Sequence, residues 1–239
     1  MNPIKKYLLS LIVNSYQENN KNILSLLEVD STATMVDLGC DDGRWTMKLA
    51  KKIKTKKVYG VEVVKERISL AKKRKVEVSN CDLNAKLVFP SNSFGFVHSN
   101  QVIEHLNDTD TFIKEIFRIL KPGGYAVIST ENLSSWHNIF ALCLGFQPFS
   151  MTNFSSLGNI GNPFALWNGK VTKNSSIKSW QHQRLFSFYG LADIFNKHGF
   201  KVENIQTSGY YPLPGFVSKI DPLHGHWIVI KLRKPKLKG

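Results

Sequence analysis

The feature that most constrains the fold is a glycine-containing turn between an apolar strand and a helix. Residues 34–38 are predicted to form the strand, residues 39–43 the turn and residues 45–53 the helix. A strand, a glycine turn and a helix in this order are typical of the first unit of an open parallel sheet. In such sheets ligands bind at the carboxyl ends of the strands, so we expect a binding site at this turn.

The alternation of strands and helices continues along the chain. Residues 108–120 carry apolar side chains on one helical face and are predicted to form a helix that ends before Lys121-Pro-Gly-Gly. The pattern implies an α/β fold: a Rossmann-like, doubly wound, mostly parallel seven-stranded sheet with helices on both faces. The other predicted strands are residues 57–64, 76–82, 94–100, 125–130, 201–207 and 226–232, and the other predicted helices are residues 65–75 and 191–198.

Two segments depart from this alternation. Residues 1–30 carry apolar side chains at helical spacing and are predicted to form one or two helices that cap the site or the sheet. Residues 133–183 lose the periodicity and are rich in glycine, asparagine, serine and aromatic residues, which is typical of a functional lid or insertion. A chain of 239 residues is long enough for one large α/β domain. We therefore predict a single domain, residues 1–239, that carries both segments.

The residues of the turn discriminate between two ligands. A dinucleotide turn needs the pattern Gly-x-Gly-x-x-Gly, whose backbone amides close on a pyrophosphate, but Asp41 and Asp42 occupy this turn. Two carboxylates would repel a pyrophosphate. S-adenosylmethionine carries a sulfonium and an ammonium group and no phosphate, so the same carboxylates are tolerable or favourable. The charge of the turn therefore favours S-adenosylmethionine.

Two further acids stand at the ends of the next two predicted strands. From Glu62 a carboxylate can accept hydrogen bonds from both ribose hydroxyls. From Asp82 a carboxylate can receive the adenine amino group. Acids at the ends of three successive strands are therefore in register for a ligand that contains a nucleoside.

These residues resemble the class I S-adenosylmethionine-dependent methyltransferases, above all those of quinone, lipid and glycan biosynthesis. The resemblance spans about residues 34–132 and is carried by Asp37-Leu-Gly-Cys-Asp-Asp-Gly, Glu62, Cys81-Asp-Leu, Val102-Ile-Glu-His-Leu and Leu120-Lys-Pro-Gly-Gly. It implies the cofactor S-adenosyl-L-methionine. By the resemblance, the methionine end of the cofactor is lined by Asp37 and Gly39 and, after the fourth strand, by Asn100 and Gln101. The ribose is bound by Glu62, and the adenine by Asp82 and Leu83. The predicted cofactor-binding set also includes Asp41 and Gly43.

One position departs from the family pattern. The family usually has glycine where Asp41 stands, and a positive backbone angle there would be less comfortable for a residue with a side chain. Aspartate is among the better-tolerated exceptions, so the departure bears on the shape of the turn more than on its ligand.

Several residues outside the turn are candidates for the acceptor side. If the acceptor is a hydroxyl, a base must remove its proton, and His105 beyond the fourth strand is the predicted catalytic base; its other reading is a helix cap. His98, inside the fourth strand, is predicted to be structural. His182 and Arg184 at the end of the insertion, and Trp136 within it, are predicted to contact substrate, although His182 also fits a solvated loop.

The acceptor is predicted to be a small molecule, a sugar or glycan, or a lipid precursor, methylated on oxygen. A formal charge of +14 and a pI near 9.7 keep RNA as an alternative substrate. Against RNA, no Asn/Asp-Pro-Pro-aromatic motif follows the fourth strand. A non-catalytic S-adenosylmethionine-binding module, suggested by Asp41, is the second alternative.

The remaining expectations concern location and metals. No run approaches the roughly 18 apolar residues of a membrane-spanning helix, so we expect a cytoplasmic protein without a transmembrane segment. The basic tail and the aromatic insertion leave peripheral contact with a membrane surface open. Cys40, Cys81 and Cys143 have no close pairs, which predicts neither a disulfide framework nor a zinc site, and no metal is expected.

Overall fold

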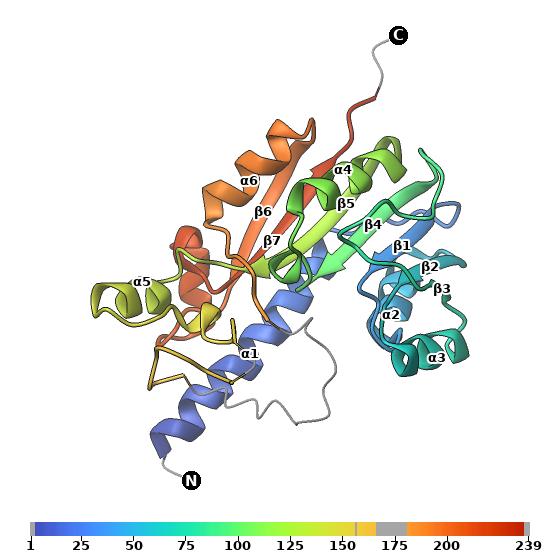
Figure 1. The fold of residues 1–239 in the computed structure, drawn as a ribbon. Helices are drawn as coiled ribbons and strands as arrows, with labels where there is room; N and C mark the ends of the chain where they lie inside the picture. Colours follow the sequence, from blue (N-terminus) through green and yellow to red (C-terminus); the bar gives the residue numbers. More distant parts are fainter. Residues whose placement is uncertain (1–2, 156, 166–180, 237–239) are drawn as a thin grey trace.

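A seven-stranded sheet forms the centre of the molecule, as the alternating sequence pattern predicts (Figure 1). The computed structural model describes residues 3–155, 157–165 and 181–236. In the order β3-β2-β1-β4-β5-β7-β6, the first five strands run parallel and β7 is antiparallel to both of its neighbours. The strands are β1 (Thr34–Leu38), β2 (Lys57–Val61), β3 (Glu77–Ser79), β4 (Phe94–Asn100), β5 (Leu120–Glu131), β6 (Lys201–Ser208) and β7 (Trp227–Arg233).

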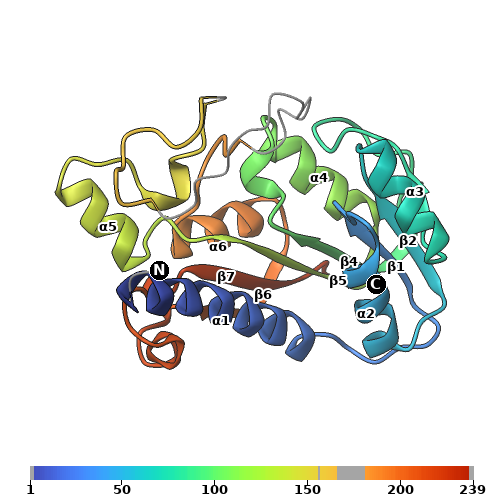
Figure 2. The ribbon, with the colours of Figure 1, turned by 90° about the horizontal axis from the view of Figure 1, so that it is seen from below.

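Helices cover both faces of this sheet (Figure 2). They are α1 (Pro3–Ser25), α2 (Arg44–Ile53), α3 (Lys65–Lys73), α4 (Thr109–Ile119), α5 (Trp136–Cys143) and α6 (Phe188–Lys197), with 3-10 turns η1 (Ile103–His105), η2 (Phe149–Met151), η4 (Gly215–Lys219) and η5 (Pro222–His224). One hydrophobic cluster contains Ile116 of α4 and Phe195 of α6, and the other contains Ile23 of α1 and Leu49 of α2. The predicted doubly wound architecture is confirmed. In the described part of the chain no helix combines the length and the apolar character needed to cross a membrane.

Local signals explain where α4 begins. Asp108 precedes the helix, and its carboxylate accepts a 2.9 Å hydrogen bond from the Thr111 backbone N–H, which satisfies one of the free donors of the first turn. Phe112, Ile113 and Ile116 on the inner face are completely buried. The helix predicted from apolar spacing is therefore confirmed, with its first and last predicted residues acting as caps.

The predicted ends of β2 and β3 are wrong, because side chains at these ends bind the backbone that follows. β2 ends at Val61 rather than at residue 64, since the Glu62 carboxylate accepts hydrogen bonds from the N–H groups of Val63 and Val64. β3 ends at Ser79 rather than at residue 82. Asp82 accepts two hydrogen bonds from Asn84 in a local turn. Side-chain bonds of this kind compete with the strand ladder.

The predicted start of β5 at residue 125 is also wrong. Leu120 already pairs with Phe94, and the register shifts between Phe94 and Phe96. The Lys121-Pro-Gly-Gly segment is therefore an irregular part of the strand itself, and Gly123 adopts φ +80 within it.

The N-terminal segment forms one long helix that belongs to the main core. α1 lies along the face of the sheet beside β6 and β7 (Figure 2). Trp227 Nε1 of β7 donates a 3.1 Å hydrogen bond to Ser15 Oγ, and its ring lies 4.8 Å from that of Tyr16. Of the two predicted arrangements, the structure shows one helix that packs over the sheet.

The predicted insertion contains more regular structure than its sequence indicated. α5 and η2 both lie within residues 133–183, and Asn138 links them, because its Nδ2 donates a 3.0 Å hydrogen bond to Ser150 Oγ. Residues 166–180, with Trp167 and Trp180, lie outside the described residues.

Candidate active site

The predicted cofactor residues gather at the carboxyl edge of the sheet. The turn of residues 39–43 follows β1, Glu62 follows β2, and Asn100 ends β4. β1 lies between β2 and β4 in the sheet: the chain leaves β1 toward β2 on one side, and after β3 it crosses to β4 on the other side. Open α/β sheets bind their ligands at a point where the strand order reverses in this way.

Two glycines of the turn occupy positions that exclude a side chain. Gly39 has φ +83, and a Cβ there would lie 2.5 Å from Val102 Cγ2. Gly43 has φ +79, and a Cβ there would lie 3.0 Å from the Ala71 Cα. The backbone of the turn thus passes directly against the segment that follows β4 and against α3, which requires glycine at both positions.

Asp41 adopts the glycine-like backbone that the family pattern anticipates, with φ +47. Its exposed carboxylate lies 3.1 Å from an Arg67 guanidinium nitrogen, and its N–H donates a 3.0 Å hydrogen bond to Glu62 Oε2. Aspartate is among the residues that enter this region most readily. The departure from glycine is therefore accommodated without a change in the direction of the turn.

Glu62 links the turn to the start of α3 by hydrogen bonds. Its Oε2 accepts the bond from Asp41, and its Oε1 accepts bonds of 2.8 and 3.0 Å from the Val63 and Val64 N–H groups. An ionised carboxylate offers about four acceptor positions, so these three bonds leave capacity for a further donor.

Asp37 lies beneath the turn and is buried among three elements. Its Oδ1 accepts a 2.7 Å hydrogen bond from His98 Nδ1 of β4, and its Oδ2 accepts a 2.6 Å bond from Thr46 Oγ1 of α2. His98, predicted to be structural, is buried in this network. In the structure Asp37 positions the turn, and its contact with the methionine end stays a prediction. Thr46 is a supporting residue that sequence reasoning missed, because a threonine inside a helix carries no specific signal.

The two residues predicted at the adenine end lie in different environments. Asp82 is exposed, and its Oδ1 accepts 2.9 Å bonds from the backbone and side chain of Asn84. Leu83 is buried in the core cluster that includes α4. The loop after β3 is therefore anchored by Leu83 while Asp82 stays accessible.

Asn100 and Gln101 are tied to α1 and β5. Asn19 Nδ2 of α1 donates a 3.3 Å hydrogen bond to Asn100 Oδ1, and Ser129 Oγ of β5 donates a 3.0 Å bond to Asn19 Oδ1. Gln101 adopts φ +56, and its Nε2 donates a 3.3 Å bond to Ser129 Oγ. Non-glycine residues in this backbone region are costly and concentrate at functional sites. Asn19 was missed, because the apolar spacing that predicts a helix over the site or the sheet does not identify which polar residue of that helix meets Asn100.

Beyond β4, His105 meets His182 although the two residues are far apart in sequence. Their ring centroids lie 4.7 Å apart, and one ligand atom each of Glu104, His105 and His182 lies within 4.8 Å of the others. His105 Nδ1 lies 3.1 Å from the Gln181 carbonyl oxygen, and His182 Nδ1 lies 2.6 Å from the Ser150 carbonyl oxygen. The structure thus joins the predicted base to one predicted substrate residue. The sequence indicated no such cluster of metal-ligating side chains.

The ionisable groups here are strongly affected by burial. Burial and the neighbouring His182 lower the pKa of His105 to about 4. Burial, reinforced by nearby Glu131, raises the pKa of Glu104 to about 8, and burial also raises the pKa of Glu131. At neutral pH His105 is therefore neutral, with a lone pair on its ring.

Arg184 and Trp136 lie on different sides of the insertion. Arg184 Nη2 donates a 2.5 Å hydrogen bond to the Asn107 carbonyl oxygen, which ties the end of the insertion to the segment after η1. Trp136 Nε1 donates a 3.1 Å bond to Asp221 Oδ2, and its ring stacks on His224 at 4.3 Å. Trp136 thus joins α5 to the segment before β7.

A second histidine pair was missed by sequence reasoning. His226 Nδ1 and His137 Nε2 lie 3.0 Å apart. Burial lowers the pKa of His137 to about 3, and burial and His137 lower the pKa of His226. His226 begins the final predicted strand. It lies beside His137 of the insertion because β7 runs antiparallel to β5, so the start of β7 is next to the end of β5.

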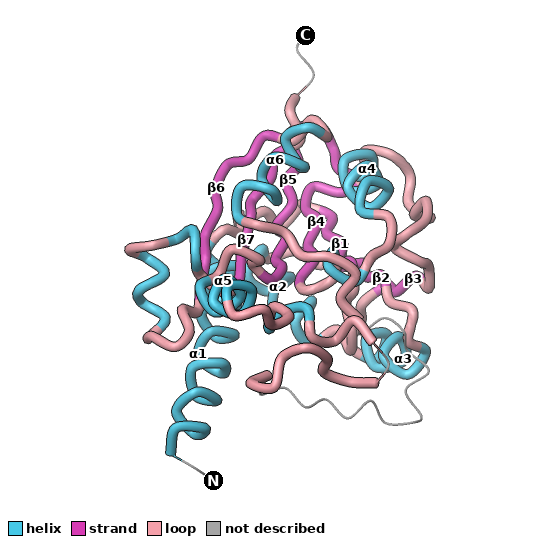
Figure 3. The backbone as a smooth tube through the Cα atoms, turned by 60° about the vertical axis from the view of Figure 1, so that its left-hand side comes forward, coloured by secondary structure: helices cyan, strands magenta, loops and turns pink. Residues whose placement is uncertain are grey.

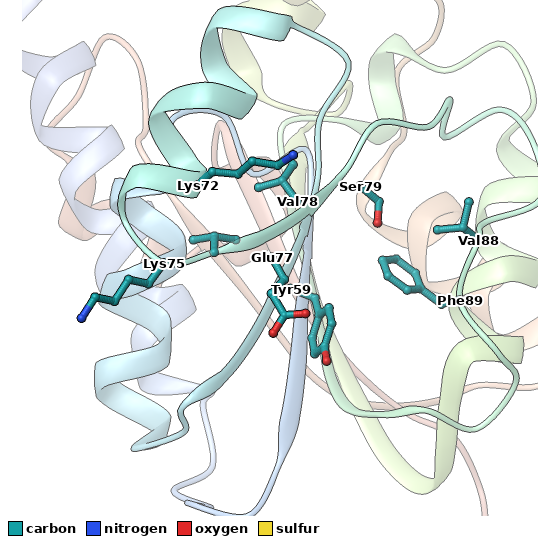
Figure 4. A pocket seen from close by; sticks show the side chains of 9 residues that line it. Tyr59, Lys72, Lys75, Glu77, Val78, Ser79, Val88 and Phe89 are labelled. Atoms are coloured by element: carbon teal, nitrogen blue, oxygen red, sulfur yellow. The ribbon is translucent and has the colours of Figure 1, made fainter.

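A pocket at the outer edge of the sheet lies away from these groups. It measures about 590 Å³ at the outer edge of the sheet and is lined by Tyr59, Lys72, Lys75, Val76, Glu77, Val78, Ser79, Val88 and Phe89 (Figure 4). It contains none of the predicted site residues. The candidate active site is therefore the carboxyl edge of the sheet, where Val102, just before Glu104 and His105, closely approaches Gly39 of the turn. Figure 3 traces the loops of the chain in pink between the strands in magenta and the helices in cyan.

Comparisons with known proteins identify the family of the chain. A family model described as a methyltransferase domain matches residues 14–205. A demethylmenaquinone methyltransferase of Bacillus licheniformis is 29% identical over 217 residues, which cover 86% of this chain and 86% of the relative.

Solved structures share the fold. An S-adenosylmethionine-dependent methyltransferase from Thermotoga maritima matches with a TM-score of 0.61 at 21% identity, covering 97% of this chain and 91% of that chain. One from Mesorhizobium loti matches with a TM-score of 0.58 at 17% identity, covering 90% and 96%. The family match includes the turn, and its cofactor is S-adenosyl-L-methionine. The chain therefore belongs to the class I S-adenosylmethionine-dependent methyltransferases.

Proposed function

We propose that this enzyme transfers the methyl group of S-adenosylmethionine to an oxygen atom of a small-molecule acceptor. The observation that carries the proposal is the cluster of Glu104, His105 and His182. Glu104 and His105 lie on the segment whose Val102 closely approaches Gly39 of the turn, and His182 comes from the end of the insertion. A hydroxyl acceptor must lose its proton, and the free ring nitrogen of His105 is the proposed proton acceptor. Alignment and exclusion of water supply the rest of the catalysis.

The proposed cofactor position follows the carboxyl edge of the sheet. The backbone of Gly39, Asp41 and Gly43 lies against the methionine end, with Asn100 and Gln101 on its other side. Glu62 binds the ribose with its remaining acceptor capacity, and Asp82 and Leu83 flank the adenine. The accessibility of Asp82 and the burial of Asp37 support a direct role for the first and a positioning role for the second.

The proposed acceptor is a quinone-like compound, a sugar or glycan, or a lipid precursor. The relative whose name specifies demethylmenaquinone supports the class of small molecules. His182 and Arg184 are proposed to face the acceptor, since His182 lies beside His105 of η1 and Arg184 contacts the segment after η1. Trp136 is proposed to form an outer wall with His224. Aromatic walls provide contact area at a low cost in side-chain entropy.

The test compares cofactor binding by the wild type and by Glu62→Ala. Calorimetric titration should show that wild type binds S-adenosylmethionine and not NADH, and that Glu62→Ala binds at least about tenfold more weakly because it loses a hydrogen bond to a charged group. Glu66→Ala is the matched control, since Glu66 is an exposed acid in the first turn of α3. A screen of hydroxyl acceptors by mass spectrometry should then detect a methylated product. Unchanged affinity in Glu62→Ala would refute the cofactor placement.

We also propose that the enzyme approaches its acceptor at a membrane surface. Large apolar side chains are exposed on two segments that the Trp136–Asp221 bond holds together: Phe140, Leu142 and Leu144 after the start of α5, and Phe216 and Ile220 around η4.

Sedimentation with anionic liposomes at low and high salt should show binding that weakens with salt and is reduced in Phe140→Ser. Val88→Ser, an exposed apolar position in the loop before β4, should bind like wild type. Equal sedimentation of all three proteins would refute this proposal.

A further inference from the structure

Three side chains with metal-ligating atoms converge beyond the carboxyl end of β4. Glu104 and His105 come from η1, and His182 comes from the end of the insertion. The three ligand atoms lie within 4.8 Å of one another. Around a tetrahedral ion with bonds of about 2.0–2.1 Å, ligand atoms lie about 3.4 Å apart, so small side-chain rotations would complete the geometry.

Each of the three side chains also has a polar atom within hydrogen-bond distance of a neighbouring group. His105 Nδ1 and His182 Nδ1 lie within hydrogen-bond distance of backbone carbonyls, those of Gln181 and Ser150. A carbonyl only accepts, so both Nδ1 atoms carry the proton and both Nε2 atoms present a lone pair. Metal-ligating histidines are held in this way, by donation of the second ring N–H to a carbonyl or carboxylate.

In the described part of the chain, Glu104, like the two histidines, has one polar atom that forms a hydrogen bond and another that does not. Glu104 Oε2 accepts a 2.9 Å hydrogen bond from Thr130 Oγ1. The side chain is completely buried, yet its Oε1 has no hydrogen-bond partner among the described residues. Oε2 of neighbouring Glu131 is likewise buried without a partner there. A buried carboxyl oxygen without a hydrogen-bond partner is costly, and coordination to a divalent cation would compensate that cost.

We propose that Glu104, His105 and His182 form a binding site for a divalent transition-metal ion, with Zn²⁺ as its reference ligand. Two imidazole nitrogens and one carboxylate oxygen match the preferences of this class, whereas Mg²⁺ and Ca²⁺ prefer oxygen ligands alone. Three protein ligands leave a coordination position open, as catalytic sites do.

The use of this open position rests on the proposed function. An acceptor hydroxyl bound there loses its proton to solvent more readily, because the cation stabilises the resulting alkoxide. That oxygen then forms a bond to the methyl carbon while the carbon–sulfur bond breaks and its electron pair stays on sulfur. The products are the methyl ether, S-adenosylhomocysteine and one proton. His105 serves as a ligand in this reaction, and the metal replaces it as the group that promotes proton loss.

The experiment measures metal binding without cofactor or acceptor. The full chain is stripped with a chelator, exchanged into chelator-free buffer, and titrated with Zn²⁺ by calorimetry and with Co²⁺ by visible absorption. We expect one equivalent to bind, and His182→Gln and His105→Gln each to weaken binding at least about tenfold, since loss of even an outer partner typically costs this much. His198→Gln is the matched control and should bind Zn²⁺ like wild type. His198 caps the end of α6, where its Nε2 lies 3.1 Å from Asp110 Oδ1 of α4.

The outcomes separate this site from the proposed function. Absence of saturable binding by the wild-type chain would overturn the metal site, and so would His182→Gln binding as tightly as wild type. S-adenosylmethionine binding is measured separately on the stripped chain. If Zn²⁺ binds but S-adenosylmethionine does not, the proposed function fails and the metal site stands. If S-adenosylmethionine binds but Zn²⁺ does not, only the metal site is refuted.

Discussion

At the scale of single residues, the turn after β1 depends on a close approach that only glycine allows. Gly39 combines a positive φ with a would-be Cβ only 2.5 Å from Val102. Gly145 has a similar φ of +77, but a Cβ there would meet nothing within 4 Å among the described residues. The two positions therefore separate the cost of the backbone conformation from the cost of crowding.

We expect Gly39→Ala to destabilise the protein more than Gly145→Ala does. Both substitutions carry a left-handed penalty of about 1–2 kcal/mol. Gly39→Ala adds about 1–3 kcal/mol for overpacking against Val102, and should also weaken S-adenosylmethionine binding. Urea unfolding and calorimetric titration measure the two effects. Equal free energies of unfolding for the two variants would contradict the close approach.

The His137–His226 pair predicts a dependence of stability on pH. Burial lowers the pKa of folded His137 to about 3 from 6.5, so between these values the unfolded chain binds a proton that the folded chain does not. The free energy of unfolding should therefore decrease as the pH is lowered below about 6.5 toward about 3. Urea unfolding across this range measures the slope. His137→Asn should reduce the slope, and His198→Asn, outside the pair, should retain it; equal slopes would refute the assignment.

At the scale of secondary-structure elements, α1 is an integral layer of the fold. Ile23 on its inner face is completely buried, whereas Val13 of the same helix is 55% exposed. Asn19 also links α1 to Asn100 at the cofactor edge. A helix outside the alternating pattern therefore contributes to both the core and the site.

We expect Ile23→Ala to lower the free energy of unfolding by about 2–5 kcal/mol, because it leaves a cavity between α1 and the sheet. Val13→Ala is the matched control on the same helix and should change stability by less than about 0.5 kcal/mol. Urea unfolding of both variants measures the difference. Similar values for the two would mean that α1 is a weakly attached cap.

At the scale of the whole molecule, a cofactor in the proposed position would contact the turn and the ends of β2 and β4, and its binding should stabilise the entire fold. At a concentration 100 times its dissociation constant, a ligand that binds only the folded state adds about 2.7 kcal/mol. For a chain of this size that corresponds to a rise in Tm of about 5–10 °C. Differential scanning fluorimetry measures the rise in Tm on addition of S-adenosylmethionine. Glu66→Ala should show the same rise as wild type, and Glu62→Ala a smaller one. A rise with NADH instead would contradict the assignment.

Local signals in the sequence were sufficient to predict the α/β architecture and most of its strands and helices. β1 and β4 occupy their predicted residues, and α4 lies within its predicted range. Apolar periodicity and caps such as Asp108 act over a few residues, so they can be read locally. The position of the turn followed as well, because the carboxyl ends of parallel strands share one edge of the sheet.

Which side chains come together in the candidate site depends on contacts between distant segments of the folded chain. Glu62 and Asp82 bind nearby backbone and shorten β2 and β3, and Asp37 turns inward to His98, none of which periodicity reveals. His105 lies beside Gln181 although 76 residues separate them. Hydrophobic spacing records only which face of an element is buried. Contacts between distant segments depend on how the elements pack, so the meeting of Glu104, His105 and His182 could be read only from the folded chain.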